Sequence, residues 1–203
     1  MKAVLVLNGE PPSLSRLKSL ASRYDVYAAD GGAEVCRTAG VRPKWVAGDF
    51  DSQSPEGLPE DWKVLKFLEQ DRTDFQKLLS TLPETVREIM ILGGLGRRLD
   101  HLLTNLLIAS EVDGDKEVVF ESERERLIRV TPACPFRSPL SPGSTLSIIP
   151  LEKVEAVRTT GLKWNLKDQP MGPGGQLGQS NQVEDAFVEI VIGAGTLFVW
   201  LEV

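Results

Sequence analysis

The feature that most constrains the fold is an alternation of short apolar runs with longer amphipathic segments along the first 120 residues. The apolar runs lie at residues 3–7, 26–29, 45–47, 63–68, 88–92 and 116–120. Helical spacing of apolar residues marks residues 13–23, 33–39 and 75–82 and the leucine-rich segment 102–107. This alternation predicts a mostly parallel β-sheet flanked by helices on both faces.

The second half of the chain has a different composition. Residues 131–143 contain four prolines, which predict a domain boundary or an irregular connector. Short strand-like pieces follow at residues 145–151, 156–164, 186–192 and 196–203. The last two flank Gly193-Ala194-Gly195 and predict a hairpin, while residues 171–178 predict a Gly-rich loop. We therefore expect an α/β domain over residues 1–125 and a small antiparallel β-sandwich or barrel-like domain over residues 126–203.

Composition and charge exclude several classes of protein. The chain has 203 residues, of which 41% are hydrophobic, so it can bury a core. A net charge of −6 makes nucleic acid and anionic membranes poor partners. Cys36 and Cys134 lie far apart, outside metal-ligand spacing, which favours reduced thiols. The apolar N-terminal run is too short for a signal peptide, and no stretch is long enough to span a membrane. We expect a cytoplasmic protein.

Carboxylates recur where the predicted strands of the first half end. They are Asp30 after the second run, Asp49 and Asp51 after the third, Asp71 and Asp74 after the fourth, and Asp100 beyond the fifth. The carboxyl ends of parallel strands meet at one edge of a sheet, so we expect these side chains to converge there. Such a cluster needs countercharge, and Mg²⁺ typically binds one or two carboxylates together with substrate phosphates. The pattern predicts a site for a Mg²⁺–nucleotide complex.

Each acidic segment also has a purely structural interpretation. Residues 30–32 (DGG) fit a simple turn, and residues 73–76 (TDFQ) fit a helix capping box. Asp100 fits the first turn of a helix, where the helix dipole favours a negative charge. The pair Asp49 and Asp51 is harder to explain structurally, because a turn needs only one aspartate.

The turn at residues 93–98 (GGLGRR) lies next to these carboxylates in the predicted sheet. Its glycines allow backbone N–H groups to approach a phosphate, and Arg98 can bind phosphate oxygens with two N–H groups. The chain has no G-x-x-x-x-G-K-[ST] motif, and GGLGRR does not fit G-x-G-x-x-G. His101 is the sole histidine, which favours a structural role and argues against zinc.

Six motifs together resemble one family, the thiamin pyrophosphokinases. They are ADGGA (29–33), GDFDS (48–52), DRTDFQK (71–77), GGLGRRLDH (93–101), TTGLKWNL (159–166) and GQSN (178–181). The resemblance covers nearly the whole chain. It implies that thiamin's hydroxyl attacks the β-phosphorus of Mg-ATP, giving thiamin diphosphate and AMP. It also implies a homodimer in which the catalytic domain of one chain faces the β domain of the other.

The resemblance also assigns roles to residues. It implies that Asp49, Asp51 and Asp74 hold Mg²⁺ and the phosphates, with Asp71 and Asp100 close by as further catalytic carboxylates. Arg98 would steady the triphosphate. The other implied nucleotide contacts are Asp30, Gly31, Thr73, Gln76, Gly93, Gly94 and Gly96.

The second half would supply the thiamin site. The resemblance implies that Trp164 stacks on the aminopyrimidine ring and that Ser180 and Asn181 hydrogen-bond its edge. Without the resemblance, Trp164 is equally well interpreted as a core aromatic. The chain departs from the family at Arg97, which replaces a glycine; if that position needs φ > 0, arginine costs about 1 kcal/mol.

Two rival functions fit parts of the sequence. A diphosphokinase for another hydroxymethyl heterocycle, such as a pterin, could use the same Mg-ATP half, but residues 159–166 and 178–181 favour thiamin. A non-catalytic thiamin or nucleotide sensor would have no need for a repelling cluster of carboxylates, which argues for an enzyme.

Overall fold

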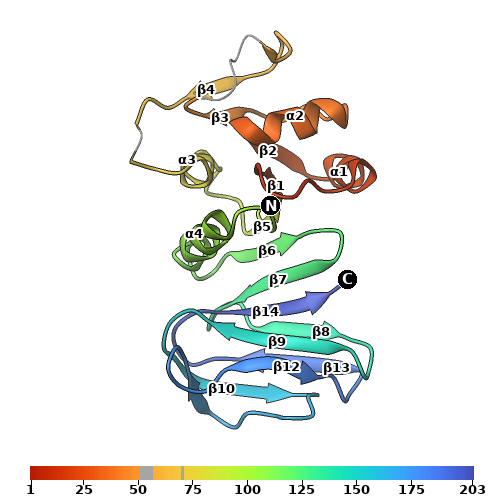
Figure 1. The fold of residues 1–203 in the computed structure, drawn as a ribbon, viewed down its shortest axis with the longest axis vertical. Helices are drawn as coiled ribbons and strands as arrows, with labels where there is room; N and C mark the ends of the chain where they lie inside the picture. Colours follow the sequence, from red (N-terminus) through yellow and green to blue (C-terminus); the bar gives the residue numbers. More distant parts are fainter. Residues whose placement is uncertain (51–56, 70) are drawn as a thin grey trace. The chain divides into compact units, whose positions relative to one another are not determined.

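The computed structural model describes residues 1–50, 57–69 and 71–203. By their internal contacts these residues form two compact units. The first comprises residues 1–108 and 120–123, and the second comprises residues 109–119 and 124–203. In Figure 1 the first unit runs from red to green and mixes helices with strands, whereas the second runs to blue and consists almost entirely of strands.

The first unit is built on a parallel sheet with the strand order β5-β1-β2-β3-β4. Its strands are β1 (Lys2–Val6), β2 (Asp25–Ala29), β3 (Val46–Gly48), β4 (Val64–Lys66) and β5 (Glu88–Leu92). All but the first residue of β1, β2 and β5 are buried, as expected for strands covered on both faces. The predicted mostly parallel sheet is confirmed.

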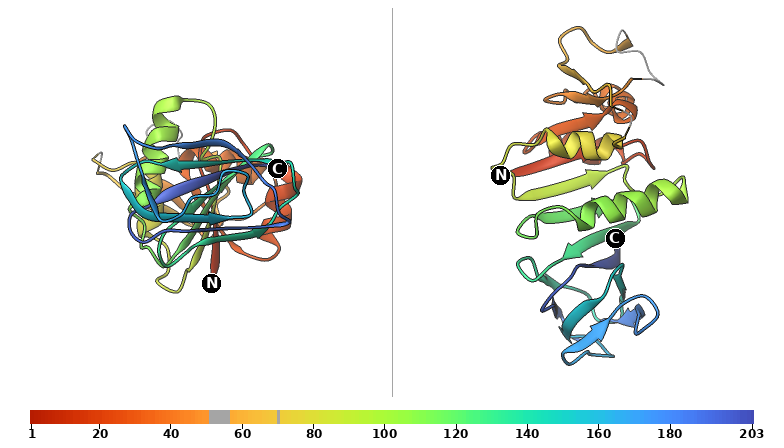
Figure 2. Two further views of the ribbon diagram at one scale, coloured as in Figure 1. Left: turned by 90° about the horizontal axis from the view of Figure 1, so that it is seen from below. Right: turned by 90° about the vertical axis from the view of Figure 1, so that its left-hand side faces the viewer.

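Helices cover both faces of this sheet. They are α1 (Leu14–Ala21), α2 (Asp30–Thr38), α3 (Asp74–Ser80) and α4 (Leu99–Ser110). Figures 1 and 2 show α1 and α2 on one face of the sheet and α3 and α4 on the other. Helix α2 begins at Asp30, three residues before the predicted start, so residues 30–32 form its first turn rather than a separate turn. None of the helices within the described ranges has both the length and the apolar character that crossing a bilayer requires.

Strand β6 (Glu117–Glu121) has residues in both units. Residues 109–119, from the end of α4 into β6, group with the second unit, whereas we predicted a single boundary after residue 125. The buried guanidinium of Arg129 ties this segment to the second unit by donating hydrogen bonds to the carbonyls of Ala109, Val112, Asp113 and Lys116. These bonds satisfy the carbonyls at the end of α4 and in the loop that follows it.

The second unit packs two antiparallel layers around an apolar core. One has the order β12-β9-β14-β7 and the other β11-β10-β13-β8. The strands are β7 (Glu125–Val130), β8 (Phe136–Pro139), β9 (Thr145–Pro150), β10 (Val154–Thr160), β11 (Gln169–Met171), β12 (Gly178–Gln182), β13 (Phe187–Val191) and β14 (Leu197–Glu202). Buried residues of both layers, including Ile148, Val199, Val157 and Ile190, form one core, so the predicted β-sandwich is confirmed.

The predicted hairpin around Gly193-Ala194-Gly195 is wrong. Strand β13 pairs with β8 and β10, whereas β14 pairs with β7 and β9 in the other layer. The three residues carry the chain between layers, held by hydrogen bonds between the backbones of Gly193, Ala194 and Glu155 and by a positive φ of 87° at Gly195.

The predicted irregular connector at residues 131–143 is also wrong in part, because β8 lies within it. Strand β8 is at the edge of its layer, where Pro139 removes no interior ladder hydrogen bond.

Candidate functional site

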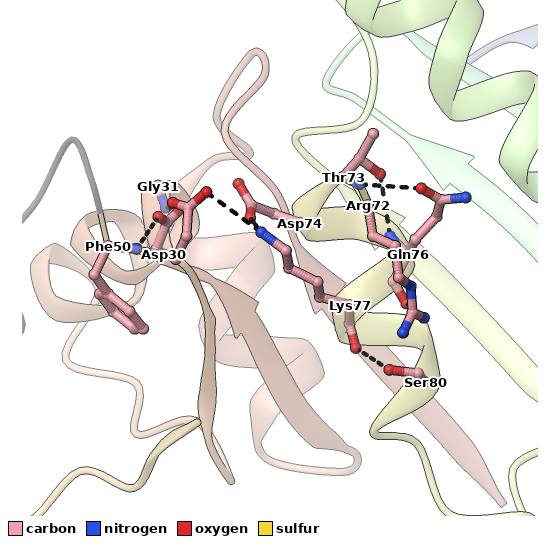
Figure 3. A network of polar contacts seen from close by, with 10 residues as sticks. Asp30, Gly31, Phe50, Arg72, Thr73, Asp74, Gln76, Lys77 and Ser80 are labelled. Atoms are coloured by element: carbon pink, nitrogen blue, oxygen red, sulfur yellow. Dashed lines mark hydrogen bonds and ion pairs between the residues drawn. The ribbon is translucent and has the colours of Figure 1, made fainter. Parts of the chain in front are cut away.

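Three aspartates meet at the carboxyl edge of the parallel sheet. Asp30 directly follows β2, Asp49 directly follows β3, and Asp74 is the first residue of α3. One carboxylate oxygen from each lies within 4.8 Å of the others, and this is the group within the described ranges that could share a metal ion. Figure 3 shows Asp30 and Asp74 directed toward the same space. The predicted convergence therefore holds for these three residues.

Asp30 is the most buried member of this carboxylate cluster. Its side chain accepts hydrogen bonds from the backbone N–H of Gly31 and, at 3.3 Å, from that of Phe50. Burial, and next the charge of Asp74, raise the pKa of Asp30 to about 6, with a smaller contribution from Asp49. The position of Asp30 inside the site is therefore electrostatically unfavourable, and the two backbone donors offset only part of that cost.

Lys77 places an ammonium beside the cluster, a role that was not predicted from the sequence. Its side chain is 1% exposed, and its ammonium lies 3.4 Å from Asp49 Oδ2 and 3.3 Å from Asp74 Oδ1 (Figure 3). Burial lowers the pKa of Lys77, but the ion pairs with Asp74 and Asp49 outweigh burial and raise it overall. The available signal was its position three residues after Asp74 in helix α3, which places both on one helical face.

The start of helix α3 is fixed by a capping box. The Thr73 hydroxyl accepts a hydrogen bond from the Gln76 N–H at 3.2 Å, and the Gln76 side chain accepts one from the Thr73 N–H at 3.0 Å. The capping interpretation of Thr73 and Gln76 is thereby confirmed, and these side chains hold the first turn that carries Asp74.

Other predicted carboxylates lie outside the cluster. Asp71 is exposed and is not part of the group that could share a metal ion. Asp100 forms a two-pronged ion pair with Arg98 at 3.1 and 2.6 Å, and both side chains are largely exposed. Hydrogen bonding from Arg98 lowers the pKa of Asp100 to about 2. Asp51 lies outside the described residues.

The Gly-rich turn after β5 is bound tightly to the loop after β1. The Gly9 N–H donates to the Gly93 carbonyl at 2.6 Å, and the Glu10 N–H donates to the Leu95 carbonyl at 2.9 Å. A Cβ at Gly9 would lie 2.2 Å from the oxygen of Gly93, so only glycine fits there. Gly93 and Gly96 themselves have φ values of 68° and 74°.

Arg97 adopts the left-handed conformation that is expected where it replaces a glycine. Its φ is 53°, a conformation that costs a non-glycine residue about 1 kcal/mol. The Arg97 guanidinium donates to the backbone carbonyl of Asn8 at 3.0 Å and to its side-chain oxygen at 3.3 Å, which offsets part of that cost. Gly94, by contrast, has an ordinary backbone; a Cβ there would lie 2.6 Å from the Phe120 ring.

The candidate thiamin residues all belong to the second unit. Trp164 is 58% exposed, so its interpretation as a core aromatic is wrong, and the Lys163 ammonium lies 4.9 Å from its ring centroid. The buried Asn181 side chain accepts from the Trp164 N–H at 3.2 Å and donates to the Trp164 carbonyl at 2.9 Å. Asn181 therefore holds the backbone of Trp164, while the neighbouring Ser180 is exposed.

Comparison with known proteins gives one consistent family. Residues 17–120 match the family model described as "Thiamin pyrophosphokinase, catalytic domain", and residues 135–197 match "Thiamin pyrophosphokinase, vitamin B1 binding domain". The chain is 27% identical over 209 residues to thiamin pyrophosphokinase 1 of Caenorhabditis elegans, covering 95% of this chain and 86% of the relative. It is 28% identical over 230 residues to thiamine pyrophosphokinase 1 of Oryza sativa subsp. japonica, covering 93% and 82%.

Solved structures share the fold. A thiamine pyrophosphokinase from Bacillus subtilis superposes with a TM-score of 0.83 and 22% identity, covering 100% of this chain and 99% of that one. A thiamin pyrophosphokinase from Geobacillus thermodenitrificans gives a TM-score of 0.84 at 24% identity, covering 100% and 98%.

The raised pKa of Asp30 gives a testable dependence of stability on pH. Its ordinary value is 3.8 and its folded value about 6, so ionised Asp30 destabilises the fold increasingly as pH rises through this interval, and by a constant amount above it. Asp30→Asn should therefore stabilise the protein more at pH 7.5 than at pH 4.5, by about 1–2 kcal/mol. Urea unfolding in EDTA measures this, with the exposed Asp61→Asn as matched control; equal effects at both pH values would contradict it.

Proposed function

This chain belongs to the thiamin pyrophosphokinase family, and we propose that its carboxylate cluster is where an ATP-dependent diphosphoryl transfer to thiamin takes place. The observation that carries the proposal is the meeting of Asp30, Asp49 and Asp74 within 4.8 Å, beside the buried ammonium of Lys77. Among the described residues of the cluster, three carboxylates face the one ammonium of Lys77, and this excess of carboxylates suits a divalent cation that brings a phosphorylated ligand.

The donor set fits Mg²⁺. Carboxylate oxygens are the ligands this hard cation prefers, and Asp49 and Asp74, both partly exposed, would hold it together with Asp51. When bound, Mg²⁺ would neutralise charge on the phosphates. Asp30 is more buried than its neighbours and tied to two backbone N–H groups, which suits it to shaping the site.

The residues of the chain would act mainly by positioning. In the proposed reaction the thiamin hydroxyl oxygen bonds to the β-phosphorus, the bond to the oxygen shared with the α-phosphorus breaks, and AMP leaves. A carboxylate of the cluster accepts the hydroxyl proton. Arg98 lies at the exposed end of the Gly-rich turn and would bind triphosphate oxygens by exchanging its partner Asp100 for the ligand.

In the second unit, Trp164 would provide the stacking surface for the aminopyrimidine ring. Its exposed indole is free to take a flat ligand on one face. Asn181 would act by fixing the Trp164 backbone, whereas the exposed Ser180 is left to hydrogen-bond the ligand edge.

We also propose that the protein is a cytoplasmic homodimer, as the family resemblance implies. Leu99, Leu103 and Leu107 of helix α4 are 49–68% exposed at helical spacing, an apolar surface that suits burial against another chain. Cys36 and Cys134 are both free thiols, in keeping with a reducing compartment.

The reaction products test the proposed function directly. Purified protein with Mg²⁺, ATP and thiamin should give AMP and thiamin diphosphate in equal amounts, and EDTA should abolish both, because the phosphates need the cation. Chromatographic separation of nucleotides and thiamin species measures this. Formation of ADP and thiamin monophosphate would place the attack on the γ-phosphorus and refute the mechanism, and turnover of a pterin but not thiamin would refute the substrate.

Removing one carboxylate tests the site. Asp49→Asn should lower kcat by about 100-fold or more, because a ligand of the cation is lost, while thiamin affinity changes little. Steady-state kinetics and equilibrium binding of thiamin separate the two effects. Asp61→Asn removes the same charge from an exposed residue of the same unit and should leave kcat within about twofold. Unchanged turnover in Asp49→Asn would exclude Asp49 as a metal ligand.

Removing the exposed indole tests the thiamin site. Trp164→Ala should raise the KM for thiamin by about 10- to 100-fold through lost stacking, and Trp164→Phe should recover most of it. The KM for ATP should stay within about twofold, since Trp164 would touch only thiamin. Phe187→Ala removes another half-exposed aromatic of the same unit and is the control. Equal effects of the two alanine variants would argue against stacking.

A further inference from the structure

Lys77 is a buried charge that the proposed reaction does not yet explain. Like Phe75 and Leu78 it is a buried residue of α3, and its side chain is 1% exposed. A buried ammonium is costly unless it is paired and hydrogen-bonded. Its partners are Asp49 and Asp74, two members of the carboxylate cluster, so its charge acts on the site itself.

The burial of Lys77 separates it from a ligand-binding lysine. With almost no exposed surface, its ammonium has little to offer a phosphate directly. It acts instead on the two carboxylates, each of which receives one of its N–H groups at 3.3–3.4 Å. Lys77 is therefore a positioning residue rather than a catalytic one.

We propose that Lys77 is a resident cation that keeps the affinity of the empty site for free divalent metal low, so that the metal enters together with the nucleotide. This inference rests on the proposed function, which makes Asp49 and Asp74 metal ligands.

The physical reason is competition for the same oxygens. Asp49 and Asp74 would have to share their oxygens between Lys77 and a metal ion, and the positive charge of Lys77 would oppose binding of the metal. A nucleotide adds negative charge and new oxygen ligands, which offset that repulsion.

The test is a titration of Mn²⁺ alone, followed by electron paramagnetic resonance of the free ion, on the full chain without nucleotide. Lys77→Met replaces the ammonium by an apolar group of similar length and should tighten Mn²⁺ binding by about 10-fold or more. The exposed Lys18→Met removes the same charge from helix α1 and should leave the affinity within about twofold. Thermal unfolding establishes that both variants are folded. Unchanged or weaker Mn²⁺ binding in folded Lys77→Met would overturn the proposal.

A second measurement keeps the inference testable if Lys77→Met does not fold. In the wild-type protein, α,β-methylene-ATP, which cannot be cleaved between its α- and β-phosphates, should tighten Mn²⁺ binding by about 10-fold or more, after subtraction of the Mn²⁺ that the analogue alone binds in a protein-free titration. Equal affinities with and without this analogue would refute a metal that enters with the nucleotide.

One further variant distinguishes failure of this inference from failure of the proposed site. Asp49→Asn should weaken Mn²⁺ binding in the presence of α,β-methylene-ATP. If it does not, the proposed metal site is wrong. If Asp49→Asn weakens binding but Lys77→Met leaves it unchanged, the site stands and only the role of Lys77 is refuted.

Discussion

Repulsion between like charges at the carboxyl edge of the parallel sheet is the constraint that the neighbouring elements of the first unit have to offset. Strands β2 and β3 and helix α3 bring Asp30, Asp49 and Asp74 within 4.8 Å of one another. Two features make this arrangement tolerable: backbone N–H groups donate to Asp30, and the Lys77 ammonium lies between the other two. The local geometry of α3 follows, since its capping box fixes the turn from which Asp74 and Lys77 both project.

The sequence was sufficient to predict this edge but not its cation. Aspartates follow the second to fifth apolar runs, and the parallel arrangement places these residues, far apart in sequence, at one edge of the sheet. Lys77 looked like an ordinary solvated lysine in a helix. Its burial depends on which face of α3 packs against β2 and β3, and tertiary contacts decide that.

The errors in the second unit have the same origin. Glycines at 193 and 195 fit a hairpin and a crossing between layers equally well, and the long-range pairing of β14 with β7 and β9 decides between them. Strand β7 was missed because charged residues interrupt its apolar pattern. One of them, Arg129, is buried because four carbonyls distant in sequence accept hydrogen bonds from its guanidinium, and the sequence does not reveal these bonds. Asn181 was predicted to hydrogen-bond the ligand, and in the structure its amide holds the backbone of Trp164.

The contact between the loops after β1 and β5 also limits which substitutions such a chain can accept during evolution. Gly9 touches the Gly93 carbonyl so closely that any side chain there must push the Gly-rich turn away, and with it Arg98. Position 97, one residue from that arginine, already carries a side chain in a glycine-like conformation and points it back to Asn8. Substitutions are therefore tolerated differently at the two places. Position 97 accepts a side chain, whereas position 9 can change only if the loops after β1 and β5 change together.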